Sequence, residues 1–132
     1  MKNVKSFSCV LDTSAIISYL ANEPGSNRVE SIKSESAIPF MALSELYYVI
    51  WRKKGKAEAD LTYALVKSWG LPILYPTEQV ILTAGRLKAT YHLGIADSYI
   101  ASFALIQNSK LVTQDMDYEV LVPDLKLFKI RS

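Results

Sequence analysis

Acidic residues follow or interrupt apolar segments at several places in this sequence. Asp12 directly follows residues 7–11, an apolar segment typical of a short buried strand, and a helical pattern begins at residue 15. An Asp in this place can cap the helix by accepting a backbone hydrogen bond. It also lies at the carboxyl end of a strand, the edge at which open parallel sheets bind ligands. Asp12 is therefore a candidate both for a helix cap and for a catalytic group.

Glu45 interrupts the apolar face of a predicted helix. In a helix over residues 41–54 it shares a face with residues three and four positions away, which include Met41 and Val49. Charged residues normally occupy the opposite, solvated face, and a carboxylate among apolar side chains is unfavourable unless it is paired or binds a cation. Two interpretations stay open: Glu45 lies at the helix rim, reaching solvent or an Arg, or it belongs to a functional site.

Further acids come from the second half of the chain. Asp97 lies at the start of a helix predicted from residue 95, where a carboxylate favours the helix dipole and needs no other role. Asp115 follows a predicted strand over residues 110–113, and Asp117 comes two residues later. Because Asp is common in turns, one of these two can be a turn residue. Asp115 is closer to the strand and is the stronger functional candidate, with Asp117 secondary.

The predicted elements bring these acids to one edge of a parallel sheet. Asp12 and Asp115 end strands, whereas Glu45 and Asp97 fall in the first turns of helices that follow strands. Bare carboxylates ~4 Å apart repel each other by ~4 kcal/mol per pair at an effective dielectric constant of ~20. Such a cluster needs protons or a hard divalent cation, and oxygen ligands without Cys or His indicate Mg²⁺ or Mn²⁺ rather than zinc. This chemistry predicts attack of a metal-activated water on a phosphodiester, without a protein nucleophile.

Strands alternate with helices, or with helix pairs, along the whole chain. This pattern predicts an α/β fold with a mostly parallel sheet and helices on both faces, in a single domain over residues 1–132. The strand over residues 37–39 is expected near a sheet edge, because Pro39 lacks an amide donor. A short helical turn is expected at residues 118–121. Strands are predicted at residues 7–11, 37–39, 71–75, 110–113 and 125–130, and helices at 15–20, 26–35, 41–54, 56–69, 76–90 and 95–106.

The composition is that of an ordinary globular protein. Of the 132 residues, 50% are hydrophobic and 21% charged, and the formal net charge of +2 is too small to imply nucleic-acid binding by itself. No run of ~20 apolar residues predicts a membrane span. Residues 1–5 lead directly into the first strand, so no signal peptide is expected. The single cysteine, Cys9, excludes an internal disulfide, fits the reducing cytoplasm and is expected to be a small core residue.

Four features of the sequence together resemble one known family. They are residues 10–14 (VLDTS), Glu45 in a mid-chain helix, residues 94–101 (GIADSYIA) and residues 111–115 (LVTQD). In this order and spacing they are similar to the PIN domain, and most closely to the VapC-type toxins of type II toxin–antitoxin modules. The resemblance runs from the first strand to the last and implies a three-layer α/β/α PIN-like fold.

The resemblance also implies an activity and a set of site residues. It implies a cytoplasmic endoribonuclease, dependent on Mg²⁺ or Mn²⁺, that cleaves RNA in single-stranded or loop regions. It implies a homodimer silenced by a small antitoxin protein that inserts into the acidic groove. Thr13 and Thr113 match positions that support the site through their hydroxyl groups, and Asp117 is a secondary metal ligand. The residues implied in both catalysis and metal binding are Asp12, Glu45, Asp97 and Asp115.

Basic residues near the predicted site are candidates for RNA contacts. For those at the end of the helix over 41–54, an equally good interpretation is a solvated helix end whose cations favour the helix dipole. Tyr91 and His92 are candidates for base stacking, although a surface loop is the simpler interpretation. The apolar belt of the helix over 41–54 is expected to be part core and part dimer or antitoxin surface. The basic candidates are Arg52, Lys53, Lys54, Lys56, Arg86 and Lys88.

Three other functions stay open from the sequence. One is a PIN-fold nuclease that works in RNA processing outside a toxin–antitoxin module. A phosphoacceptor signalling domain also uses an acidic Mg²⁺ pocket, but it needs an acidic pair at the first strand, where Thr13 follows Asp12, and a Lys at the end of the last strand. A non-enzymatic interaction module would keep the pocket for docking only, and the presence of all the expected acids argues against it.

Overall fold

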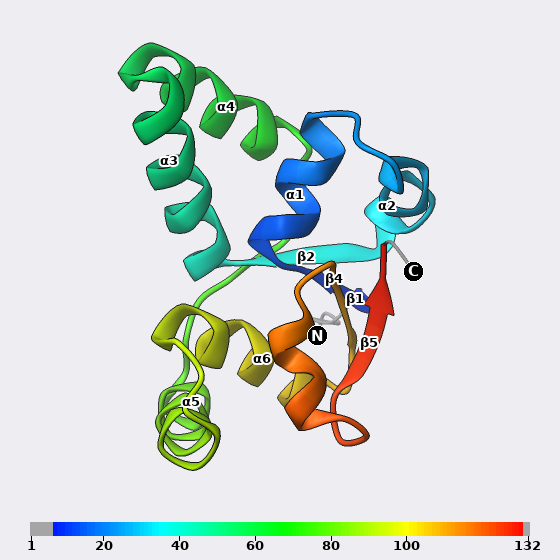
Figure 1. The fold of residues 1–132 in the computed structure, drawn as a ribbon, viewed down its shortest axis with the longest axis vertical. Coiled ribbons are helices and arrows are strands. Elements are labelled where there is room, and N and C mark those ends of the chain that lie inside the picture. Colours follow the sequence, from blue (N-terminus) through cyan, green and yellow to red (C-terminus); the bar gives the residue numbers. More distant parts are fainter. Residues whose placement is uncertain (1–6, 131–132) are drawn as a thin grey trace, which may run out of the picture.

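Five short parallel strands form the sheet around which the molecule is built (Figure 1). The computed structural model describes residues 7–130, so the expectation for residues 1–5 lies outside it. The strands follow the order β3-β2-β1-β4-β5, and every neighbouring pair is parallel, which confirms the predicted α/β class. The bounds are β1 Cys9–Leu11, β2 Ser36–Pro39, β3 Ile73–Leu74, β4 Lys110–Thr113 and β5 Lys126–Lys129.

Helices cover both faces of this sheet (Figure 1). α1 (Thr13–Leu20), α2 (Ser26–Ile32), α3 (Phe40–Lys54) and α4 (Lys56–Ser68) lie on one side. α5 (Glu78–Tyr91) and α6 (Ile95–Gln107) lie on the other side. Two 3₁₀ helices, η1 (Lys33–Glu35) and η2 (Met116–Leu121), complete the described elements. The three layers are those predicted, with helices on both faces of a parallel sheet.

β2 is the second strand from one edge of the sheet, so it lies near an edge as predicted, but it is paired on both sides. It pairs with β1 on one side and with β3 on the other. Pro39 is accommodated because it is the last residue of β2 and Phe40, which follows it, already begins α3. The φ of −65° at Pro39 suits the residue that precedes a helix. Since no loop separates β2 from α3, the strand fixes the position of the first turns of α3.

The other differences from prediction are differences of length. β1, β3 and β5 are shorter than the strands predicted at 7–11, 71–75 and 125–130. The helix predicted over 26–35 is divided into α2 and η1, and the turn predicted at 118–121 extends to the whole of η2.

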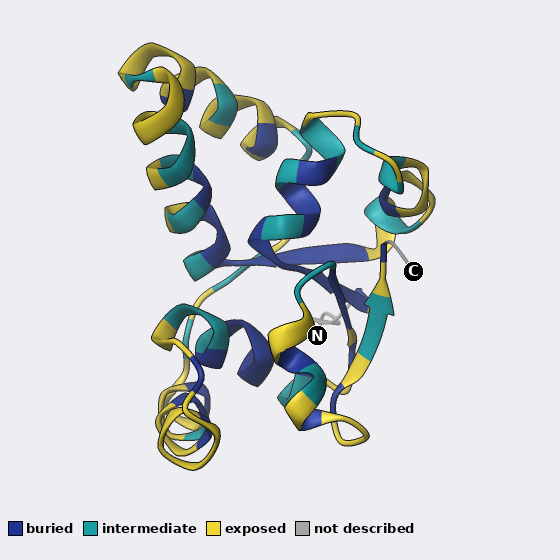
Figure 2. Cartoon of the chain, in the orientation of Figure 1, coloured by how far each residue is buried: buried dark blue, intermediate teal, exposed yellow. Residues whose placement is uncertain are grey.

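The inner strands form the centre of the core, which Figure 2 shows as dark blue ribbon between yellow outer helix faces. Val10 and Leu11 are fully buried, and Cys9 is a buried core residue as predicted. From β1 the chain first adds β2 and β3 on one side and then crosses to add β4 and β5 on the other. The strand order therefore reverses between β1 and β4, and the carboxyl ends of strands at such a reversal form a natural crevice.

Within residues 7–130, no helix combines the length and the apolar character needed to cross a membrane.

Candidate functional site

Asp12 lies at the carboxyl end of β1, and it does cap the helix that follows. Its Oδ1 accepts the backbone N–H of Ala15, at 2.9 Å, in the first turn of α1. The same oxygen accepts the Ser14 hydroxyl at 2.7 Å, and Oδ2 accepts the Thr113 hydroxyl at 2.5 Å. With only 3% of its surface exposed, Asp12 is a buried carboxylate surrounded by donors. Capping is therefore compatible with a place in a functional site and does not compete with it.

The burial of Asp12 favours its protonated form. Desolvation raises the pKa of this carboxyl group to about 6, against an ordinary value of 3.8, and the negative charge of Asp115 acts in the same direction. The hydrogen bonds from Thr113, Ala15 and Ser14 lower the pKa and offset part of this rise. Asp12 is thus ionised near neutral pH at an energetic disadvantage that a nearby cation would remove.

Glu45 lies in the second turn of α3, one turn later than predicted, and its side chain is half-buried. Its Oε1 accepts the hydroxyl of Thr13, the first residue of α1, at 2.6 Å. This hydrogen bond connects α3 to α1 directly beside Asp12. Of the two interpretations left open by the sequence, this contact and the half-buried side chain favour a place in a functional site.

Asp97 lies in the first turn of α6 and is half-buried. α6 follows α5 and not a strand, so the expected connection is wrong, although the predicted helix start is correct. Oδ1 of Asp97 accepts a hydrogen bond from the Tyr118 hydroxyl at 3.1 Å. Burial raises the pKa of Asp97 despite this hydrogen bond. The charges of the neighbouring acids act in the same direction as burial; these are Asp115, Glu45 and Asp117.

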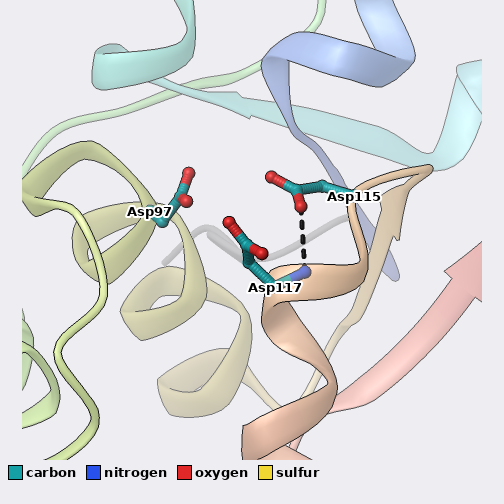
Figure 3. A group of neighbouring side chains, drawn as sticks. All are labelled: Asp97, Asp115 and Asp117. Atoms are coloured by element: carbon teal, nitrogen blue, oxygen red, sulfur yellow. Dashed lines mark hydrogen bonds between the residues drawn. The ribbon is translucent and has the colours of Figure 1, made fainter.

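Asp115 and Asp117 stand at the start of η2. Asp115 caps this helix, because its Oδ1 accepts the backbone N–H of Asp117 at 2.9 Å. The N–H of Asp115 donates to the Thr113 hydroxyl at 2.8 Å, so Thr113 is hydrogen-bonded to both Asp12 and Asp115. Carboxylate oxygens of Asp97, Asp115 and Asp117 lie within 4.8 Å of one another. Figure 3 shows these three side chains pointing toward one another from α6 and from the start of η2.

One cavity of about 230 Å³ joins the acids from both halves of the chain. The described residues form two ion pairs, Lys56–Asp60 and Lys129–Glu119, and neither involves an acid of this cavity. Clustered carboxylate oxygens without a neutralising Lys or Arg match the ligand preference of Mg²⁺ and Mn²⁺. The donor set of the cavity therefore fits a hard divalent cation. The lining residues are Asp12, Thr13, Ser14, Ile17, Glu45, Asp97, Ile100, Asp115 and Tyr118.

Sequence reasoning missed two hydroxyl groups that contact these acids. Ser14 donates to Asp12, and its oxygen accepts the backbone N–H of Gln114 at 3.1 Å, which ties α1 to the end of β4. Tyr118 donates to Asp97 from η2. Ser14 is only two residues from Asp12, whereas no helical or strand spacing indicates the partner of Tyr118, which is 21 residues away. The available signal is general: a Tyr that is fully buried needs a hydrogen-bond acceptor for its hydroxyl group.

The basic candidates for RNA contacts lie outside the acidic cavity. Arg52, Lys53 and Lys54 are exposed in the last turn of α3, and the Arg52 guanidinium donates to the Tyr48 hydroxyl at 2.6 Å. Arg86 lines a separate cavity of about 430 Å³ next to α5 and α6. The positions of the three α3 residues fit the simpler interpretation, in which solvated cations at the end of a helix favour the helix dipole.

Replacing Thr113 with Val is expected to destabilise the fold by about 1.5–3 kcal/mol near pH 8 in metal-free buffer, because the buried Asp12 carboxylate loses a hydrogen bond from a donor. Urea unfolding of the variant and of the wild type measures this difference. Thr113→Ser is the matched control, since it keeps the hydroxyl group and loses only a methyl group. A Thr113→Val variant as stable as Thr113→Ser would contradict the argument.

Comparison with known proteins identifies the fold that presents this cavity. VapBC2 from Rickettsia felis, solved bound to a DNA fragment from its promoter, is 25% identical with a TM-score of 0.74, covering 92% of this chain and 97% of that chain. VapBC-1 from nontypeable Haemophilus influenzae is 24% identical with a TM-score of 0.74, covering 94% and 98%. VapC20 from Mycobacterium tuberculosis, described as a toxin that cleaves the sarcin–ricin loop, is 13% identical with a TM-score of 0.70, covering 87% and 95%.

A comparison with curated protein sequences gives no match. A family model matches residues 9–121, and its description is "PIN domain". The matched segment begins with the first residue of β1, ends with the last residue of η2 and includes every acid of the cavity. This match spans most of the 132 residues, and the chain therefore belongs to the PIN domain family.

Proposed function

We propose that this protein is an endoribonuclease of the VapC toxin type that hydrolyses RNA phosphodiester bonds with the help of Mg²⁺ or Mn²⁺. The observation that carries the proposal is the meeting of carboxylates from β1, α3, α6 and the start of η2 at one cavity without a neutralising Lys or Arg. A cavity of this kind favours a divalent cation and disfavours a bare anionic substrate. Membership of the PIN domain family supports the same chemistry.

Asp97, Asp115 and Asp117 are the proposed main ligands of the ion, because their oxygens already lie within 4.8 Å of one another. Asp12 and Glu45 line the acidic cavity together with Asp97 and Asp115, whereas Asp117 is exposed beside it. When bound, the ion supplies an activated water and neutralises charge that develops on the phosphate. Asp12 and Glu45 are held in place by hydroxyl donors, Thr113 and Thr13 respectively. The protein thus contributes a rigid, acidic frame and no covalent nucleophile.

The partners that we propose are an RNA substrate, a small antitoxin protein and a second copy of the same chain. The similarity to VapBC2 supports the toxin–antitoxin context, because it extends over 97% of that chain at 25% identity. A cytoplasmic location follows from the same proposal, since the RNA substrate is found there.

The phosphoacceptor interpretation loses support from two positions. Asp12, the residue that would accept the phosphoryl group, has only 3% of its surface exposed and accepts hydrogen bonds on both oxygens. Lys129, in the last strand, forms an ion pair with Glu119 and is not among the residues that line the acidic cavity.

The test is cleavage of single-stranded and stem-loop RNA by the purified protein. We expect cleavage in Mg²⁺ or Mn²⁺ and intact RNA in EDTA, with activity restored when the ion is added back. Ca²⁺ is an informative control, because it binds carboxylates but tolerates a looser geometry than Mg²⁺. Cleavage that persists undiminished in EDTA would refute the proposed metal dependence.

A further inference from the structure

Tyr118 is the largest fully buried side chain among the described residues, and its hydroxyl group lies at the wall of the acidic cavity. The hydroxyl donates to Oδ1 of Asp97 at 3.1 Å. We propose that Tyr118 is a positioning residue of the metal site: its hydroxyl fixes the Asp97 carboxylate so that it faces Asp115 and Asp117. This inference rests on the proposed function, because it concerns the same ion.

The hydroxyl of Tyr118 is not needed to fill space. The aromatic ring lies in the hydrophobic core cluster, and a Phe ring would occupy the same volume. A phenol at a fully buried position is unfavourable unless its hydroxyl has a partner. Its hydrogen-bond partner is Asp97, which is half-buried and has neighbouring carboxylates that repel it. The hydrogen bond therefore opposes a rotation of Asp97 away from the other acids.

The element that carries Tyr118 also carries two of the other acids. Asp115 caps η2 through the N–H of Asp117, and Tyr118 is the next residue of the same 3₁₀ helix. Asp97 comes from α6, which belongs to a different part of the chain. The Tyr118–Asp97 hydrogen bond thus connects η2 to the first turn of α6. It keeps the three carboxylates turned toward one another, as in Figure 3.

Tyr118→Phe tests this role through ion binding rather than through cleavage. We expect the variant to fold, and to bind Mn²⁺ about 10- to 100-fold more weakly than the wild type in isothermal titration calorimetry. Tyr47→Phe is the matched control, because it also removes a phenol–carboxylate hydrogen bond, from Tyr47 to Asp60 at 2.5 Å, but at a site away from the acidic cavity. Mn²⁺ affinity is expected to stay unchanged in this control.

A double-substitution cycle separates positioning from a general loss of structure. In an Asp97→Asn background, Tyr118→Phe is expected to change Mn²⁺ affinity less than twofold, because the oriented carboxylate is already gone. Equal losses in both backgrounds would overturn the positioning role, and so would an unfolded Tyr118→Phe protein in circular dichroism. If Tyr118→Phe binds Mn²⁺ as tightly as the wild type, this inference fails while the proposed function stands. If the wild type does not bind Mn²⁺, both fail.

Discussion

Replacing Asp97 with Asn is expected to reduce the rate of RNA cleavage by about 10³-fold, the scale seen when one preorganised electrostatic group is removed from an active site. Asn is nearly the same size as Asp but carries no charge, so it is a poor ligand for a hard cation. Asp97 is one of three carboxylates whose oxygens converge within 4.8 Å, and its loss leaves two. In a toxin–antitoxin context, the same substitution is expected to remove toxicity to the host cell.

The fold of Asp97→Asn is expected to persist. The side-chain oxygen of Asn still accepts the Tyr118 hydroxyl, which keeps the one hydrogen bond that Asp97 receives from η2. Loss of a negative charge from the first turn of α6 costs about 0.3–1 kcal/mol through the helix dipole. Relief of the repulsion from Asp115, Glu45 and Asp117 acts in the opposite direction. Removal of a half-buried charge also acts in that direction, so the variant is expected to fold and to be no less stable than the wild type.

Initial rates of cleavage of a fluorescent RNA, measured in Mg²⁺ and in Mn²⁺, provide the comparison. Glu78→Gln is the matched control, because it also removes one negative charge from the first turn of a helix, at an exposed position on α5. Wild-type rates are expected for the control. An Asp97→Asn protein that cuts RNA as fast as the wild type would show that Asp97 has no catalytic role.

The sequence predicts the positions that local patterns determine. Asp12 follows an apolar strand and precedes a helix, and both neighbours are visible within a few residues. Glu45 interrupts the apolar face of a helix whose period is equally local, and it lies in the same cavity. The pattern alone cannot exclude a solvated Glu, because the deciding hydrogen bond comes from Thr13, which is 32 residues away.

What the sequence could not predict depends on contacts between distant segments. β2 was expected near an edge because Pro39 lacks an amide donor, and it lies next to the edge strand. Its pairing on both sides could not be predicted, because strand order depends on where each helical crossover returns to the sheet. The start of α6 was predicted from its own pattern. Its place beside the reversal of strand order between β1 and β4 depends on packing against α5 and the sheet. The hydroxyl of Tyr118 could not be assigned, because its acceptor is separated from it by 21 residues.

A common physical property connects the parts of this site. Asp12, Glu45 and Asp97 accept hydrogen bonds from hydroxyl groups, and these donors are uncharged. A Lys or Arg in the same places would stabilise the carboxylates more strongly, but it would compete with a metal ion for them. Neutral donors orient the carboxylates and leave their negative charge available. When no cation is bound, repulsion among these carboxylates destabilises the folded state, and this effect can be measured as a change in the free energy of unfolding.

Asp12→Asn is expected to make the metal-free protein more stable at pH 8, by at most about 3 kcal/mol, because it removes a buried charge whose pKa is raised from 3.8 to about 6. The Asn NH₂ group cannot accept the Thr113 hydroxyl, so loss of this hydrogen bond reduces the gain. The folded state of the wild type binds the Asp12 proton more tightly than the unfolded state does. Wild-type stability is therefore lost as the pH rises from about 4 to about 6, and the loss is complete above that range. The advantage of the variant should disappear toward pH 4.

Urea unfolding in EDTA, at intervals from pH 4.5 to pH 8, measures the stability difference between the two proteins. Added Mn²⁺ is expected to stabilise the wild type more than the variant, because an ion that binds only the folded state raises its stability. The variant should also fail to cut RNA, so that one substitution strengthens the apo fold and removes the activity. If Asp12→Asn is less stable than the wild type at pH 8 in EDTA, then the hydrogen bonds to Asp12 outweigh the burial of its charge. In that case the inference that the Asp12 charge destabilises the metal-free fold is wrong.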